Sequence, residues 1–178
     1  VDEIKYLILT HTDFDHFQSA KLIKQMSNCK IMVSGLAAEF INNGYTKLPD
    51  GTKLLTKLIS SLGRFIGKGK FGYEPFQADI LVENEFELNI SDSSIKIIET
   101  AGHSSDSISI IVDNEIALVG DAMFGVFRHS VFPPFADNTE KVIESWGKLL
   151  KTDCVVFFPG HGSAISRMIV QKNYYKMK

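Results

Sequence analysis

Residues 4–16 read IKYLILTHTDFDH, which places a short apolar run directly before a cluster of polar side chains. The apolar part, residues 4–10, is typical of a buried β-strand. From Asp15 to Met26 the apolar residues recur at helical spacing, which predicts a helix. The imidazoles and carboxylates of residues 11–16 are therefore expected in a turn held by a rigid strand, where functional side chains are commonly placed.

Three more segments share this layout of an apolar strand followed by a turn that contains a histidine or an aspartate. They read TAGHSSDS at residues 100–107, LVGDAMF at residues 118–124 and FFPGHG at residues 157–162. A lone histidine after a strand is usually a hydrogen-bonded structural residue. Here four of the chain's five histidines lie in such turns, together with several aspartates. Imidazole and carboxylate together suit zinc, iron or manganese, so the pattern predicts a metal site.

The rest of the chain alternates predicted strands and helices. Strands are expected at residues 30–34, 80–82, 86–90, 95–99, 107–113, 116–120 and 154–158, and helices at residues 36–42, 52–66, 139–150 and from residue 166 onward. Residues 67–76 are expected to form a loop, because they are rich in glycine and lysine. This order is typical of a layered α/β enzyme, and a length of 178 residues fits one domain over residues 1–178.

The composition excludes several classes of protein. Hydrophobic residues make up 44% and charged residues 22%, as in soluble globular proteins, which argues against disordered and fibrous chains. A net charge of −2 gives no basic excess, so no nucleic-acid partner is expected. No apolar run approaches the roughly 18 residues of a membrane span, so no membrane partner is expected. Two widely separated cysteines indicate a reducing, cytoplasmic setting, and a small molecule is the expected substrate.

The four polar strings resemble, in the same order, the metal-binding motifs of the metallo-β-lactamase superfamily, and they cover residues 4–165. The string HTDFDH resembles that family's HxHxDH signature, with Asp13 at the second histidine position. The resemblance implies an αββα sandwich with a two-metal site at one edge. It also implies a ligand set: His11, Asp13 and His103 for the first metal, Asp15, His16 and His161 for the second, and Asp121 as the bridge.

The same resemblance implies a metal-dependent hydrolase, in which a hydroxide held by two divalent metal ions attacks an ester, thioester, lactone or similar bond. Asp15 would be catalytic, because it would orient that hydroxide and accept its proton. Zinc is the expected metal, while the harder carboxylate of Asp13 makes iron or manganese compatible. Three alternatives stay open: a phosphodiesterase or nuclease of the same superfamily, a flavodiiron-like redox protein, and a non-catalytic metal-binding protein.

Three further expectations concern the surroundings of the motifs. Strands of the family normally precede the first motif by several dozen residues, so the sandwich is expected to be N-terminally incomplete, with an exposed sheet edge that could support a homodimer. Residues 45–78 are expected to form either a substrate lid or a surface helix that packs on the sandwich. His129 and Phe132 follow the LVGDAMF string and are expected to contact substrate or to be ordinary loop residues.

Overall fold

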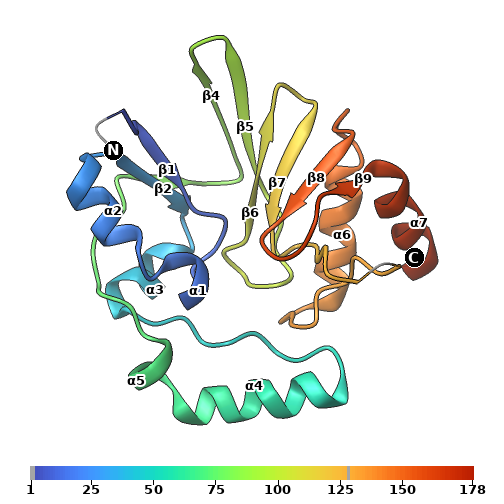
Figure 1. Ribbon diagram of the computed structural model, residues 1–178, viewed down its shortest axis with the longest axis horizontal. Helices are drawn as coiled ribbons and strands as arrows, with labels where there is room; N and C mark the ends of the chain where they lie inside the picture. The colour runs from blue at the N-terminus through green and yellow to red at the C-terminus, as the bar shows by residue number, and fades with distance from the viewer. Residues whose placement is uncertain (1–2, 128) are drawn as a thin grey trace.

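Two β-sheets lie face to face in the computed structural model (Figure 1). The structure describes residues 3–127 and 129–178; for residue 68 it describes the backbone but not the side chain. The first sheet has three parallel strands in the order β1 (Tyr6–Ile8), β2 (Lys30–Ser34) and β3 (Ile80–Val82). The second sheet has six strands in chain order: β4 (Glu85–Ile90), β5 (Ser93–Glu99), β6 (Ile108–Val112), β7 (Ile116–Gly120), β8 (Val156–Pro159) and β9 (Ile165–Ser166). In this sheet β7 and β8 are parallel, and the other neighbours are antiparallel.

Helices cover the outer face of each sheet (Figure 1). The first sheet carries α1 (Phe14–Phe17), α2 (Ala20–Ser27) and α3 (Ala37–Asn43), and the second carries α6 (Thr139–Leu149) and α7 (Arg167–Met177). The helices α4 (Leu54–Ile66) and α5 (Lys68–Phe71) lie below both sheets in the view of Figure 1. Among the described residues, no helix is both long and apolar enough to cross a membrane.

Because successive side chains of a strand point to opposite faces of the sheet, the buried apolar side chains form three hydrophobic cores. Ile31 and Val33 of β2 pack against the helices of the first sheet, whereas Met32 between them packs against the second sheet. In β5, Ile97 lies between the sheets and Ile98 packs on the side of α6. Successive strand residues point to opposite faces, so each central strand of this kind supplies two cores. The result is the four-layer αββα sandwich that the sequence led us to expect.

Three local expectations differ from the structure. The helix predicted from Asp15 to Met26 is two helices, α1 and α2, separated at Gln18 and Ser19. The loop predicted at residues 67–76 contains the single turn α5 at its start. The two-residue strand β9 was not predicted, because two residues are too few to show an alternating pattern. The hairpin between β6 and β7 turns at Asp113 and Asn114, as expected. Both residues have positive φ, and the N–H of Glu115 closes the turn by donating to the carbonyl of Val112.

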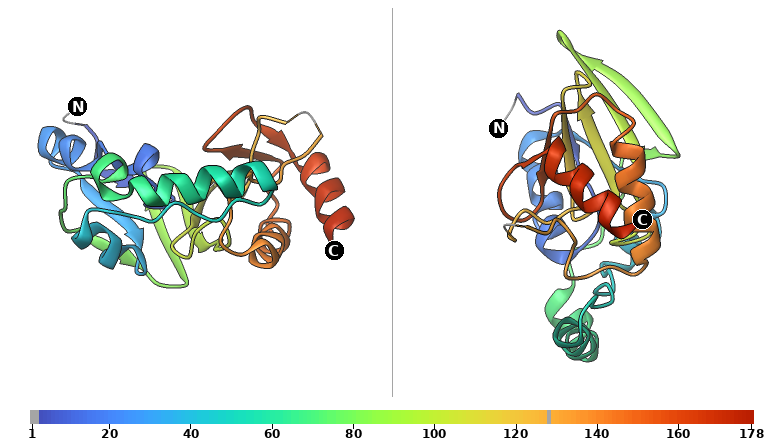
Figure 2. Two further views of the ribbon diagram at one scale, coloured as in Figure 1. Left: turned by 90° about the horizontal axis from the view of Figure 1, so that it is seen from below. Right: turned by 90° about the vertical axis from the view of Figure 1, so that its right-hand side faces the viewer.

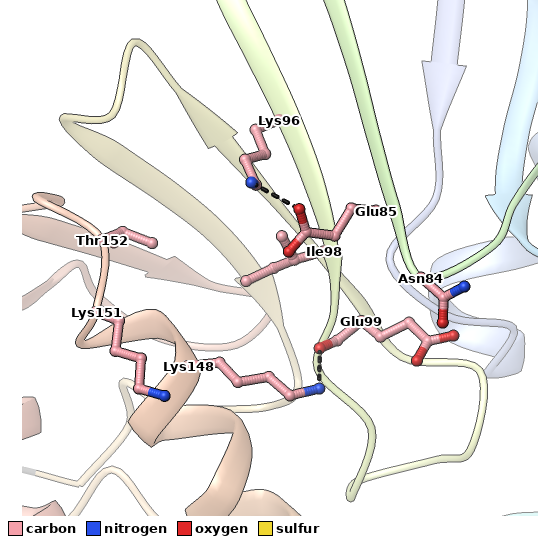
Figure 3. A pocket seen from close by; sticks show the side chains of 8 residues that line it. All are labelled: Asn84, Glu85, Lys96, Ile98, Glu99, Lys148, Lys151 and Thr152. Atoms are coloured by element: carbon pink, nitrogen blue, oxygen red, sulfur yellow. Dashed lines mark hydrogen bonds and ion pairs between the residues drawn. The ribbon is translucent and has the colours of Figure 1, made fainter.

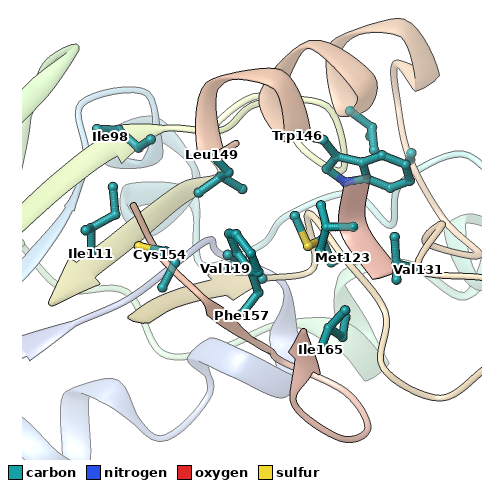
Figure 4. Close-up of a cluster of buried hydrophobic side chains, with 14 residues drawn as sticks. Ile98, Ile111, Val119, Met123, Val131, Trp146, Leu149, Cys154, Phe157 and Ile165 are labelled. Atoms are coloured by element: carbon teal, nitrogen blue, oxygen red, sulfur yellow. The ribbon is translucent and has the colours of Figure 1, made fainter. Parts of the chain in front are cut away.

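Trp146 anchors the outer layer of the second sheet (Figure 4). The chain's single tryptophan is fully buried in α6, and its Nε1–H donates a 2.7 Å hydrogen bond to the carbonyl of Ala122. Helix α6 begins after Asn138, whose side chain accepts a hydrogen bond from the backbone N–H of Lys141. The indole therefore ties α6 to the segment that directly follows β7.

The substitution Trp146→Phe should lower the free energy of unfolding by about 2–3 kcal/mol, because it removes this buried hydrogen bond and part of the buried ring. Urea unfolding followed by far-ultraviolet circular dichroism measures the effect. Tyr175→Phe is the matched control, since the Tyr175 side chain is largely exposed, and it should change stability by less than about 0.5 kcal/mol. A Trp146→Phe protein as stable as the parent would show that the indole is not an anchor.

Candidate metal centre

The seven predicted ligands come from five segments, of which four follow strands and one is helix α1. His11 and Asp13 follow β1, Asp15 and His16 lie in α1, and His103 lies in the connection between β5 and β6. Asp121 directly follows β7, and His161 follows β8. Three of these segments belong to the second sheet and two to the first, so the site lies where the sheets meet.

Three buried residues, His11, His103 and Asp121, form the first group. Their potential ligand atoms all lie within 4.8 Å of one another. Asp13 lies beside this group, because its Oδ2 is 3.2 Å from Nε2 of His103 and 3.9 Å from Nε2 of His11. The structure therefore brings together the residues predicted for the first metal.

The more exposed second group consists of Asp15, His16 and His161, whose potential ligand atoms also lie within 4.8 Å of one another. Nε2 of His16 is 3.1 Å from Nε2 of His161, and Oδ2 of Asp15 is 3.4 Å from Nε2 of His161. Asp121 reaches this group as well. Its carboxylate oxygens are 3.6 Å from Nε2 of His16 and 3.5 Å from Nε2 of His161, while Oδ2 is 3.8 Å from Nε2 of His103.

Several polar atoms of the cluster are buried without a hydrogen-bond partner among the described residues. They are Nε2 of His11, Oδ1 of Asp13 and Oδ1 of Asp121. An unpartnered buried donor or acceptor normally costs free energy. Because imidazole nitrogens and carboxylate oxygens converge here, a divalent cation is the partner that fits this set of atoms.

The charges of the cluster shift its proton affinities. Burial lowers the pKa of His103, but the adjacent carboxylates of Asp13 and Asp121 outweigh burial and raise this pKa to about 9. Burial and the neighbouring histidines lower the pKa of His11 well below its usual value. Burial raises the pKa of Asp121, against the opposing effect of the nearby imidazoles. The carboxylates of Asp13 and Asp121 therefore favour the protonated form of His103 when no metal is bound.

A buried chain of hydrogen bonds supports the turn that carries the first ligands. Oδ2 of Asp106 accepts hydrogen bonds from the backbone N–H of Thr12, at 3.0 Å, and from its hydroxyl, at 2.7 Å. The hydroxyl of Thr46 donates to Oγ1 of Thr12 and lies 2.8 Å from the hydroxyl of Tyr73. The sequence interpretation missed Asp106 and Thr12, although both lie inside the quoted strings. The sequence shows that both residues are polar. It does not show that they form a hydrogen bond with each other, because they are 94 residues apart in the chain.

Other contacts fix the imidazole rings. Nδ1 of His103 lies 2.8 Å from the carbonyl oxygen of Phe135, and Nδ1 of His11 lies 3.0 Å from Oγ1 of Thr10. Such contacts orient a histidine so that Nε2 faces a metal. Gly160 leaves room for the cluster, since a Cβ at this position would come within 2.6 Å of Oδ1 of Asp121 and 2.5 Å of the ring of His16.

A cavity of about 310 Å³ opens onto both groups. Five predicted ligands line it, and most of the remaining wall is apolar: Phe14, Leu48, Pro49, Ile59, Gly63, Phe71, Phe124 and Phe135. No lysine or arginine occurs among the described residues that line it. Leu48, Pro49, Ile59, Gly63 and Phe71 belong to residues 45–78, so the predicted lid segment supplies much of this wall.

His129 and Phe132 lie elsewhere. They line a neighbouring cavity of about 620 Å³ beside the first turn of α4, and Phe132 packs edge-on against Trp146. The structure thus does not bring them together with the predicted ligands. A third hollow, of about 440 Å³, lies between β4, β5 and α6 and is lined by Lys96, Lys148 and other residues (Figure 3). None of the seven predicted ligands lines it, so the candidate site is the cavity next to the histidines.

Thr12→Val should weaken zinc binding about tenfold, because it removes the hydroxyl that bonds to Asp106 in the turn between two ligands. Competition with a chromophoric chelator measures the affinity. Thr46→Val is the matched control: it removes the next hydroxyl along the chain but leaves the Thr12–Asp106 contact, so it should change zinc affinity less. Equal affinities in the parent and Thr12→Val would contradict a positioning role for Thr12.

Zinc binding at pH 7 should release a proton from His103, because its pKa of about 9 keeps the metal-free imidazole protonated and only the neutral ring can ligate. The apparent zinc affinity should therefore rise between pH 6 and pH 8. Calorimetric titration with zinc in buffers of different ionisation enthalpy counts the protons released. Binding without proton release, at an affinity independent of pH, would rule out the protonated His103.

Comparison with known proteins agrees with this geometry. The family model for the metallo-beta-lactamase superfamily matches residues 1–161. A "Probable metallo-hydrolase" of Methanocaldococcus jannaschii is 27% identical over 175 residues, which are 94% of this chain and 74% of the relative. "Glyoxylase B2" of Dictyostelium discoideum is 23% identical over 68% of this chain and 36% of its own length. A crystal structure of an archaeal metallo-beta-lactamase superfamily protein from Sulfolobus tokodaii superposes with a TM-score of 0.73 at 23% identity, covering 99% of this chain and 69% of that one. The fold, the order of the ligand segments and the family match together place this chain in the metallo-β-lactamase superfamily, to which it belongs.

Proposed function

We propose that this protein is a hydrolase that uses two divalent cations to cleave an ester, thioester or lactone. The observation that carries the proposal is the position of Asp121, whose carboxylate lies within 4 Å of imidazoles from both ligand groups. A shared carboxylate reduces the repulsion between two adjacent cations and so favours a two-metal site. One relative named above, a probable metallo-hydrolase, supports hydrolysis as the reaction class.

The proposed ligands are His11, Asp13 and His103 for one cation, Asp15, His16 and His161 for the other, and Asp121 for both. Zinc is the proposed metal, and the Asp13 carboxylate makes iron or manganese compatible. When bound, two such cations lower the pKa of water and polarise the carbonyl under attack. The remaining tasks, which are substrate binding and proton transfer, fall to side chains of the cavity.

Asp15 is the proposed proton acceptor. Its side chain is 41% exposed and lines the cavity, whereas Asp13 is buried and holds a hydrogen bond with His103. A base must reach both solvent and substrate, and Asp15 meets this condition better than Asp13. Contact with His161, at 3.4 Å, orients the Asp15 carboxylate.

The cavity wall favours an uncharged substrate with an apolar acyl group. Phenylalanine, leucine, proline and isoleucine side chains form most of the wall, and the described lining has no lysine or arginine that could hold a phosphate. Nucleic-acid substrates are bound chiefly through lysine and arginine contacts to phosphates. This favours acyl hydrolysis over the phosphodiesterase alternative. Both cysteines are buried and unpaired, which supports the predicted reducing, cytoplasmic setting.

Asp121→Asn should lose most bound metal and lower the hydrolysis of p-nitrophenyl butyrate at least 100-fold, because it removes the charge shared by both groups. Asp13→Asn should lose less metal. Elemental analysis of zinc-reconstituted protein and initial rates check both statements. Asp92→Asn is the matched control, since this exposed residue lies in the β4–β5 turn away from the site.

Bis-p-nitrophenyl phosphate, a thioester and a lactone complete the substrate panel. Turnover of one acyl substrate that disappears in Asp121→Asn and persists in Asp92→Asn would support the proposal. Turnover of the phosphodiester alone would assign the site to the other reaction class. Full zinc loading without turnover of any substrate would favour the non-catalytic alternative.

A further inference from the structure

Helix α4 turns its apolar face away from the protein. Its large side chains are mostly exposed, with exposed fractions of 79% for Leu54, 69% for Leu55, 63% for Leu58, 62% for Leu62 and 89% for Phe65. A helix on the surface of a soluble protein normally buries this face and exposes its polar one. In α4 the buried residues are Ser60 and Gly63, so the orientation is reversed.

Specific contacts fix this orientation. The hydroxyl of Ser60 donates to the carbonyl of Pro49 at 2.6 Å, and Nε of Arg64 donates to the carbonyl of Leu48 at 2.8 Å. Gly63 packs so closely that a Cβ there would lie 2.3 Å from the Leu48 side chain. Arg64 also forms ion pairs with acidic residues outside the helix. The polar side of α4 is thus the side that packs on the protein, and the apolar side faces outward.

Helix α4 projects from the body of the molecule, so a flat surface such as a membrane could contact it. Seen from below, α4 runs across the underside of the molecule, and in the side view it projects beyond both sheets (Figure 2). Val126 and Phe127, which are 58% and 50% exposed, extend the apolar surface at its start, where Nζ of Lys53 lies 5.9 Å from the Phe127 ring centroid. The exposed apolar surface therefore continues from α4 onto a second segment.

Positive charge is concentrated in the same part of the chain. Residues 45–73 contain six lysines and arginines and one acidic residue, a net charge of +5. The whole chain has a net charge of −2, so the remainder carries −7. A helix with a broad apolar face and neighbouring lysines is typical of segments that lie in the interface of an anionic membrane.

We propose that α4 docks in the plane of an anionic phospholipid surface, with its leucines and Phe65 inserted among the lipids and the surrounding lysines near the headgroups. The charge distribution favours lipid over a second copy, because pairing two α4 helices would bring two segments of net charge +5 together. With 13 residues the helix is too short to span a bilayer, so the interaction is with the surface only. This proposal revises the expectation of no membrane partner, which rested on the absence of a spanning segment.

Co-sedimentation of the full chain with vesicles tests the proposal. Vesicles of phosphatidylcholine with one-third phosphatidylglycerol should bind the protein, binding should fall as salt is raised, and pure phosphatidylcholine vesicles should bind at least tenfold more weakly. The double variant Leu58→Glu/Leu62→Glu should reduce binding at least tenfold. Lys57→Gln should reduce it about fivefold.

Met168→Glu is the matched control, because Met168 is 74% exposed but lies on α7, at the right-hand edge of Figure 1 and away from α4, and this variant should bind like the parent. A Phe65→Trp variant provides a second readout, since its emission should shift to shorter wavelength with anionic vesicles while buried Trp146 stays constant. Failure of the parent to sediment, or no emission shift, would overturn the proposal. A parent dimer that becomes monomeric in Leu58→Glu/Leu62→Glu would also overturn it and assign the face to a second copy. None of these measurements depends on hydrolysis, so they stand apart from the proposed function.

Discussion

Seven imidazole and carboxylate side chains from five segments have to lie within a few ångströms of one another at one edge of the sandwich. Three of their atoms are buried without a hydrogen-bond partner among the described residues, and the carboxylates of Asp13 and Asp121 repel each other. Such an arrangement opposes folding, because buried polar groups lose water and gain nothing in return. The surrounding structure compensates by holding each ligand segment separately: Asp106 holds the first turn, the Phe135 carbonyl holds His103, and Trp146 holds the segment after Asp121.

The two unequal halves of the sandwich contribute different ligands. The helix-covered parallel sheet presents the turn after β1, while the larger sheet presents the ligands that follow β5, β7 and β8. Neither half contains a complete group of ligands, since His11 needs His103, and His16 needs His161. The apolar layer between the sheets, which includes Met32 and Ile97, therefore sets the distance between ligands as well as contributing stability.

Much of this arrangement follows from the sequence, because strands and ligand turns leave local patterns. The residues 30–34 and 80–82 form strands within the expected bounds, and every predicted ligand lies in one of the four quoted strings. What the sequence did not reveal depends on contacts between distant residues. The link from Thr12 to Asp106 joins two strings that look independent. The spacing of leucines in α4 indicates an amphipathic helix, but spacing alone does not say whether the protein or another surface covers the apolar side.

The segment that carries α4 is held to the rest of the protein by a backbone pairing at each end. Gly51 pairs with Phe135, and Gly72 pairs with Tyr45, each through an isolated β-bridge. Residues 53–71 therefore lie between two fixed points of the backbone. The hydrogen bonds that hold the turns of His11 and His103 come from residues outside that span. A different span of similar end-to-end distance could be exchanged into this position during evolution while the histidines and aspartates stayed in place. Such an exchange would give the same sandwich and metal ligands a new exposed surface and a new cavity wall, while the fold stayed the same.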